Sequence, residues 1–305
     1  MDPSLIIPGR VEPTTDRSGL RMIQLNHSKG QAQICLQGAQ VIEFTPANQP
    51  PVLWLSNNSR FETGKAIRGG IPICWPWFGD HPTDPTLPAH GFARNSAWTV
   101  LASQADDHST NLTLGLEDNE STRALWPFGF KLELNVRLSQ ALTLTLTTHN
   151  SNRTDIQVSE ALHSYFAIDD IHHTQISGLE GSRYQDKLRH GMPVNQQGAV
   201  RIRAETDRVY LNHESPLTID DPGNRRRIEI QKQRSRTTVI WNPWQAKSAA
   251  MTDMTDDGYA RMLCVESANA LDNTLQIPPG GTHSLTTRLE SIPYKEPNRN
   301  SNEAP

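Results

Sequence analysis

The sequence predicts an all-β protein, a large antiparallel β-sandwich with few short helices. Three observations lead to this prediction. Apolar residues alternate with polar ones over many short segments, as they do on strands with one buried face. Turn residues separate nearly all of these segments, and the helical patterns that would join parallel strands are missing. The chain has 305 residues, which is enough to bury a large core in one sandwich.

The clearest strand pattern spans two neighbouring segments. In Lys131–Leu138 every second residue is leucine or valine, and Ala141–Thr147 continues the period of two. Ser139 and Gln140 stand between these segments, so the sequence predicts a hairpin with one face on the core. Asn111–Leu116 repeats the same alternation and is expected to be another strand.

The other expected strands are short segments of apolar or β-branched residues bounded by turn residues. In chain order they are Arg21–Leu25, Gln31–Leu36, Gln40–Thr45, Val52–Leu55, Trp98–Ala102, Gln157–Phe166, Val209–Leu211, Arg227–Gln231, Thr237–Trp241, Met262–Ser267 and His283–Leu289. One short helix is expected over Gln245–Met251, after Pro243.

The two ends of the chain differ from its middle. Residues 1–18 and 293–305 are polar and contain almost nothing to bury, so we expect a flexible N-terminal segment and a disordered tail. Between them no linker divides the chain. The sequence therefore predicts a single domain over residues 19–292.

The composition excludes several classes of function. No apolar run approaches the roughly 18 residues that a membrane span needs. The net charge of -4, from 29 basic and 33 acidic residues, gives no general attraction to nucleic acid or to anionic membranes. The one dense basic cluster, Asn224–Arg227, is expected to be a hairpin turn. No nucleotide-binding glycine loop and no internal repeat are present.

The cysteines and the N-terminus indicate a cytoplasmic protein. Cys35, Cys74 and Cys264 are odd in number and form no CxxC pair, as expected of reduced thiols. The first ten residues contain neither the basic region nor the apolar stretch of a signal peptide. A monomer is the expected state, because no long apolar edge strand or heptad pattern is visible.

Residues suited to ligand binding or catalysis are most frequent in Ala66–Trp98, a stretch rich in proline and glycine. Trp75, Trp77 and Phe78 offer flat aromatic faces that suit a sugar ring, although tryptophans can equally plug the end of a sandwich. Arg68 and Arg94 carry guanidinium groups suited to an oxyanion such as phosphate, although a single arginine is more often a solvated surface residue.

Four further residues are candidates for proton transfer or substrate binding. His163 lies in a strand-like stretch among polar neighbours and has the pKa range of a general acid at neutral pH. Glu266 ends an apolar segment, where it is either a rim charge or a general base held in a cleft. Asp207 either accepts hydrogen bonds from a ligand or caps a turn, and His90 lies within the proline- and glycine-rich segment.

Metal chemistry and serine hydrolysis are poorly supported. Cys74, Asp80, His81 and His90 are near one another in the chain but lack the HxH, HxxxH or CxxC spacings typical of metal sites. No GxSxG nucleophile motif occurs.

Several motifs, taken together, resemble the hexose-6-phosphate mutarotases, or glucose-6-phosphate 1-epimerases, of the aldose 1-epimerase superfamily. The resemblance covers roughly residues 20–290, with its motifs in family order. They are RGGIPICWPWFG (Arg68–Gly79), PAHGFAR (Pro88–Arg94), Trp98, ALHSYF (Ala161–Phe166), TDRVY (Thr206–Tyr210), WNPW (Trp241–Trp244), Asp253–Met254, DGY (Asp257–Tyr259) and CVE (Cys264–Glu266).

The resemblance implies a galactose-mutarotase-like sandwich, with the site in a cleft on one sheet and neither a metal nor an organic cofactor. It places the catalytic acid–base pair on His163 and Glu266. It places substrate binding on Arg68, Arg94 and Asp207, with His90 lining the site. Ala89 departs from the pattern, since some relatives carry a substrate-contacting glutamine there.

The chemistry of anomer exchange needs only a base at the O1 hydroxyl and an acid at the ring oxygen, without a cofactor. We therefore expect Glu266 to act at O1, His163 at O5, and Arg68 and Arg94 at a 6-phosphate. A small-molecule substrate, glucose 6-phosphate above all, is the expected partner. Two alternatives stay open: a catalytically inactive sugar-phosphate-binding protein, and a mutarotase for a neutral hexose.

Overall fold

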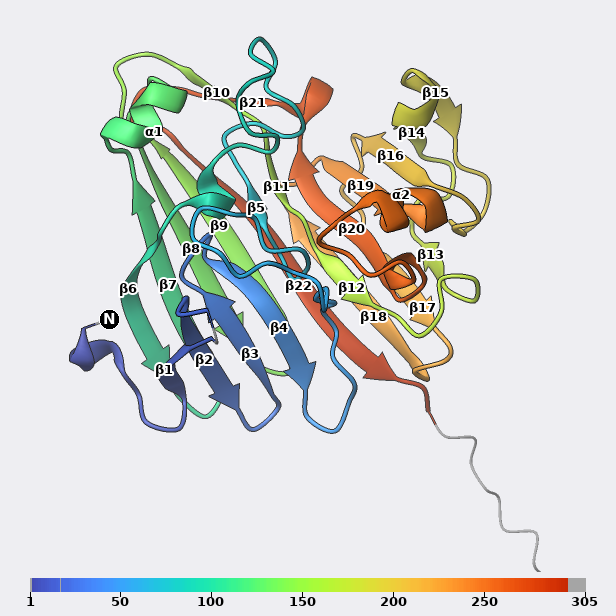
Figure 1. Ribbon diagram of the computed structural model, residues 1–305, viewed down its shortest axis with the longest axis horizontal. Coiled ribbons are helices and arrows are strands. Elements are labelled where there is room, and N and C mark those ends of the chain that lie inside the picture. The colour runs from blue at the N-terminus through green and yellow to red at the C-terminus, as the bar shows by residue number, and fades with distance from the viewer. Residues whose placement is uncertain (1, 17, 296–305) are drawn as a thin grey trace, which may run out of the picture.

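The computed structural model describes residues 2–16 and 18–295, which form three antiparallel sheets and one short strand pair (Figure 1). The N-terminal sheet has the order β1 (Val11–Thr15), β2 (Arg21–His27), β3 (Gly30–Cys35) and β4 (Gln40–Pro46). A separate pair joins β10 (Ile156–Val158) to β21 (Leu275–Ile277).

Two eight-stranded sheets form the rest of the fold. The β22 sheet has the order β13 (Gln175–Ser177), β17 (Leu217–Asp221), β18 (Arg226–Gln233), β22 (Thr282–Pro293), β9 (Leu142–Asn150), β8 (Phe130–Leu138), β7 (Thr110–Glu117) and β6 (Thr99–Ala105). The β20 sheet has the order β15 (Met192–Asn195), β14 (Arg183–Asp186), β16 (Thr206–Leu211), β19 (Thr237–Asn242), β20 (Met262–Asn269), β11 (Glu160–Leu162) and β5 (Ile73–Cys74), with β12 (Tyr165–Ala167) also paired to β20.

The sheets pack in two layers. One layer is the β22 sheet; the other consists of the N-terminal sheet, which packs over β7 and β8, and the β20 sheet, which packs over β22. One apolar cluster runs between them and includes Ile34 from the N-terminal sheet, Leu144 from the β22 sheet and Val265 from the β20 sheet. The predicted all-β sandwich is confirmed.

The alternating segments become the regular strands of the β22 sheet. Along β8 and β9 the leucines and valine of the predicted pattern are buried, while the residues between them are exposed or half-buried. The hairpin between them is confirmed: Leu138 pairs with Leu142, and the Ser139 N–H donates to the Ala141 carbonyl. The Asn224–Arg227 cluster also forms the predicted hairpin turn, between β17 and β18.

Two expected strands differ in the structure. Val52–Leu55 makes only isolated bridges, from Leu53 to Phe166 and from Leu55 to Gly69. Gln157–Phe166 is divided into parts of β10, β11 and β12, because the chain leaves strand geometry at Ser159 and again at His163 and Ser164. The second interruption contains His163.

The ends of the chain also differ from expectation. The prediction of a loose N-terminal segment is wrong for Val11–Thr15, which pairs along its whole length with β2. This strand has little apolar surface, so backbone pairing rather than burial places it. At the other end β22 continues to Pro293, and residues 296–305 of the expected tail lie outside the described residues.

The helices are few and short, as predicted. They are α1 (Glu120–Leu125) and α2 (Trp244–Ala250), with 3-10 turns at Pro3–Leu5, Ala93–Asn95, Lys187–Arg189, Gly258–Ala260 and Leu271–Asn273. Helix α2 follows Pro243 and lies within one residue of the predicted range. Among the described residues, none of these helices has the length and apolar character needed to cross a membrane.

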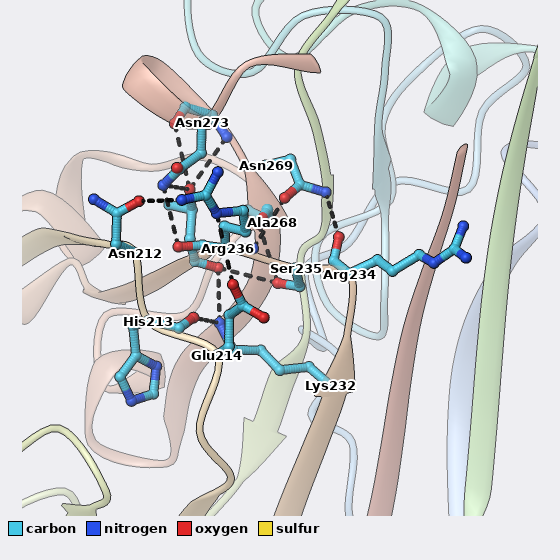
Figure 2. Close-up of polar contacts among 12 residues, drawn as sticks. Asn212, His213, Glu214, Lys232, Arg234, Ser235, Arg236, Ala268, Asn269 and Asn273 are labelled. Carbon is cyan, nitrogen blue, oxygen red and sulfur yellow. Dashed lines mark hydrogen bonds and ion pairs between the residues drawn. The ribbon is translucent and has the colours of Figure 1, made fainter. Parts of the chain in front are cut away.

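A buried polar network fixes the turn between β18 and β19 (Figure 2). The Lys232 ammonium donates to the His213 and Thr237 carbonyls and to Thr238 Oγ1, the last at 2.6 Å. The Asn269 amide donates to the Arg234 carbonyl at 2.8 Å. These bonds satisfy backbone groups that the turn would otherwise leave buried without partners.

Candidate active site

A cleft of about 350 Å³ opens on the face of the β20 sheet that points away from the β22 sheet. Ser267 faces the β22 sheet, where its hydroxyl bonds Thr287 Oγ1 at 3.1 Å. Since neighbouring side chains on a strand point to opposite faces, Glu266 must point the other way. The cleft is lined by Arg68, Phe78, Gly79, Asp80, His90, His163, Tyr165, Lys187, Asp207, Val239, Trp241, Lys247 and Glu266.

The structure brings His163 and Glu266 together at the base of this cleft. His163 lies in the break between β11 and β12, both of which pair with β20, the strand that carries Glu266. This break places His163 Nε2 at 3.3 Å from Glu266 Oε1. The His163 ring stacks on Tyr165 with 4.7 Å between ring centroids, which fixes its orientation.

Both members of the pair are almost completely buried, with 10% of the His163 side chain and 1% of the Glu266 side chain exposed. His163 Nδ1 and Glu266 Oε2 have no hydrogen-bond partner among the described residues. An unpartnered buried polar atom is costly, and native structures keep few of them outside functional sites. Both residues line the cleft, so these atoms are positioned to serve a ligand.

Burial shifts the two proton-transfer groups toward their neutral forms. It raises the pKa of Glu266 well above the ordinary glutamate value, and the nearby Asp207 carboxylate adds to the shift. It lowers the pKa of His163 well below the ordinary histidine value, helped by His90, Arg94 and Arg68. Burial therefore disfavours the charged form of each group. An anion bound near Arg68 would favour protonation of His163.

His90 is held as a neutral hydrogen-bond donor. Its backbone is left-handed, with φ 66°, and its Nδ1 accepts a bond from the Gly79 N–H at 3.3 Å. This bond assigns the ring proton to Nε2. Burial, with the charges of Arg94, Lys187 and Arg68, lowers the pKa of His90 to about 3. Its Nε2–H can therefore donate to a ligand oxygen throughout the physiological pH range.

Arg68 lines the cleft, but it is already engaged by the protein. Its Nε and Nη2 lie 3.1 and 3.0 Å from Asp253 Oδ2, and its Nη1 donates to the Tyr165 hydroxyl at 3.0 Å. These contacts hold the guanidinium rigidly beside the ring that supports His163. The Asp253 carboxylate also balances part of its charge.

Arg94 does not line the cleft. Its Nη2 donates to the Ala89 carbonyl at 2.7 Å, and its Nε is buried with no partner among the described residues. Arg94 contributes through its charge, which lowers the pKa of both His90 and His163. Its predicted position in the cleft wall is therefore not observed.

The expectation that Trp75 or Trp77 floors the site is wrong. Trp75 is fully buried in the core, where Nε1 donates to Thr148 Oγ1 at 3.1 Å and the ring packs against Phe130. Trp77 is 5% exposed and its Nε1 donates to the Pro88 carbonyl. Both plug the sandwich, as the alternative interpretation held. Phe78, the third residue of the predicted aromatic cluster, does line the cleft, and Tyr165 and Trp241 complete its aromatic wall.

Asp207 is the remaining predicted residue, and it does line the cleft. It pairs in register with Trp241, so both side chains emerge on the same face of the sheet. Burial raises the pKa of Asp207. Sequence reasoning missed Tyr165 and Trp241 as site residues although both lie in quoted motifs. It also missed Lys187 and Lys247, which no local pattern distinguishes from surface lysines.

Among residues 2–16 and 18–295, no three His, Cys, Asp or Glu side chains come close enough together to hold a metal ion. The cysteines Cys35, Cys74 and Cys264 are free and buried.

Comparison with known proteins places this cleft in context. Residues 21–290 match the family model described as aldose 1-epimerase. A Salmonella typhimurium protein described as "Putative glucose-6-phosphate 1-epimerase" is 40% identical over 252 residues, covering 82% of this chain and 84% of that one. A Cenchrus ciliaris protein with the same description is 33% identical over 292 residues, covering 90% and 86%.

A solved structure supports the same grouping. The crystal structure of a "putative mutarotase (YeaD)" from Salmonella typhimurium matches this fold with a TM-score of 0.89 and 35% identity, covering 94% of this chain and 95% of that one. The fold and the enzyme class that the sequence motifs imply are thereby confirmed. The chain belongs to the aldose 1-epimerase family and is an isomerase of the mutarotase type.

Proposed function

We propose that the protein interconverts the α and β anomers of hexose 6-phosphates, with glucose 6-phosphate the foremost substrate. The observation that carries the proposal is the contact between His163 and Glu266, 3.3 Å apart at the base of a cleft with cationic walls. The two proteins compared above are described as acting on glucose 6-phosphate, which supports the same substrate for this chain.

Each residue of the pair has one task in ring opening. Glu266 takes the proton from the O1 hydroxyl, and His163 delivers a proton to the ring oxygen O5. The C1–O5 bond breaks and a C1 carbonyl forms. Rotation about C1–C2 presents the other face of that carbonyl, and closure runs the two proton transfers in reverse. No electrons are lost or gained, and the pair ends with the protons it began with.

The substrate's own charge helps to prepare the pair. Ring opening needs Glu266 ionised and His163 protonated, whereas burial favours both neutral forms. A phosphate near Arg68 offsets part of the positive charge that disfavours protonated His163. His90 and Asp207 orient sugar hydroxyls, one as a donor through Nε2 and the other as an acceptor.

The experiment that tests the proposal is anomer exchange followed by NMR on glucose 6-phosphate, galactose 6-phosphate and free glucose, with purified protein and no added metal. We expect fast exchange on the phosphorylated sugars and slow exchange on free glucose. Exchange on free glucose alone would indicate a mutarotase for neutral hexoses. No exchange on any sugar, combined with binding of glucose 6-phosphate, would indicate a binding protein.

A further inference from the structure

Three cationic side chains line the cleft, and two of them are already paired with carboxylates. Arg68 contacts Asp253 at 3.0 Å, and Lys247 contacts Glu205 at 2.8 Å. Lys187 is the third, and within residues 2–16 and 18–295 no carboxylate lies within ion-pair distance of its ammonium. Its ammonium is therefore the one of these three cationic groups without a paired carboxylate among the described residues.

Lys187 is nevertheless held over the cleft. Its Nζ lies 5.5 Å from the centroid of the Phe78 ring, a cation–π contact across to the opposite wall. The 3-10 turn Lys187–Arg189, between β14 and β15, is fixed by the Asp186 carboxylate, which accepts a bond from the Leu188 N–H at 3.0 Å. Lys187 itself is exposed, so its ammonium is accessible to a ligand that enters the cleft.

We propose that Lys187 is the residue that determines selectivity for the 6-phosphate, by donating from its ammonium group to the phosphate oxygens. The inference rests on the proposed function and adds to it the identity of the selecting residue. A lysine ammonium is a compact cation with three donors and suits a phosphate as a point charge. Arg68 is engaged by Asp253 and Tyr165, and it fixes the site's geometry more than it supplies free charge.

The variant Lys187→Met tests this directly, because it keeps a long side chain against Phe78 and removes the charge. We expect the KM for glucose 6-phosphate to rise by about ten-fold or more, as for loss of one charge-assisted hydrogen bond, with kcat little changed. Exchange on free glucose is expected to stay within a factor of about two, and Lys187→Arg to restore most of the lost affinity.

Arg189→Met is the matched control. It removes an equal charge from the same turn, but the Arg189 side chain is 79% exposed and does not line the cleft. We expect its KM to equal that of the wild type. Equal KM values for Lys187→Met and wild type, or equal losses on free glucose and glucose 6-phosphate, would overturn the inference.

A binding measurement separates this inference from the proposed function. Calorimetric titration with glucose 6-phosphate tests Lys187 even if the wild-type protein proves inactive. Weaker binding by Lys187→Met than by Arg189→Met would support the role of Lys187 whatever the turnover. Equal binding by these two variants, or no binding by the wild type, would overturn it.

Discussion

At the scale of single residues, the proposed acid–base pair was the part of the site most accessible from the sequence. The motifs around His163 and Glu266 resemble those of a known family, and this resemblance assigns both residues to the site. The chemistry of ring opening explains why one imidazole and one carboxylate suffice. Their contact could not be predicted, because it depends on a strand break at His163 and on the register between β11, β12 and β20. For Trp75, residue type was a poor guide, since an aromatic ring suits a core as well as a sugar.

The corrected position of Trp75 leads to a stability prediction. Trp75→Ala is expected to lower the free energy of unfolding by about 3–5 kcal/mol, because it empties a large core position and leaves Thr148 Oγ1 without its donor. Urea denaturation measures the change. At a temperature where the variant is folded, its KM for glucose 6-phosphate should be close to that of the wild type. A raised KM with unchanged stability would instead favour the role as a sugar platform.

At the scale of elements, the segments with strict alternation were predicted well, and short polar strands were not. Strand β14 reads RYQD and buries only Tyr184 fully, so its identity as a strand comes from pairing with β15 and β16 rather than from its own pattern. Strand β20 is buried at all eight positions, because the β22 sheet covers one face and side chains such as Tyr165 and Met254 pack on the other. Because Glu266 is buried in this strand, it is not a solvent-exposed charge at the rim of the sheet.

Lys232, in β18 just before the turn to β19, is a titratable group that should make stability depend on pH. Burial lowers the pKa of Lys232 from 10.5 to about 7. Between pH 7 and 10.5 the unfolded chain therefore binds more protons than the folded one, so stability rises with pH across this window. The free-energy cost of burying the Lys232 side chain is fully present below about pH 7 and absent above about pH 10.5.

The free energy of unfolding of the wild type, minus that of Lys232→Met, should become more positive from pH 7 to pH 10. The slope should reach at most about 1.4 kcal/mol per pH unit, the limit for one proton. Urea denaturation at a series of pH values measures it, with the exposed Lys29→Met as the control. A difference that does not change with pH would contradict the prediction.

At the scale of the whole molecule, the sandwich was predictable, but the contacts that join its sheets were not. Arg226 belongs to a basic cluster that the sequence places in a turn, and in the structure its side chain is 1% exposed. Its Nε pairs with Asp221 Oδ2 at 3.0 Å. Its other nitrogens donate to the carbonyls of Pro50 and Pro51, which follow the N-terminal sheet, and of Ala167 in the β20 sheet. One side chain thus joins the β22 sheet to the β20 sheet and to the segment that follows the N-terminal sheet.

Arg226→Met is therefore expected to lower the free energy of unfolding by about 3–5 kcal/mol, because it leaves Asp221 buried without its partner. Arg227→Met, at the next position, removes an exposed arginine that pairs with Asp220 at 3.2 Å, and should cost less than about 1 kcal/mol. Chemical denaturation of both variants gives the comparison. Similar losses in the two would show that Arg226 does not join the sheets as described.

The proposed proton exchange of His163 and Glu266 with a hexose 6-phosphate is measured by the NMR exchange rate between the anomers of glucose 6-phosphate. The rate is compared for the wild type, His163→Ala and Glu266→Gln, each shown to be folded by circular dichroism. We expect fast exchange for the wild type and a loss of at least about 100-fold in each variant, the scale of general acid–base catalysis. Near-normal exchange in either folded variant would contradict it.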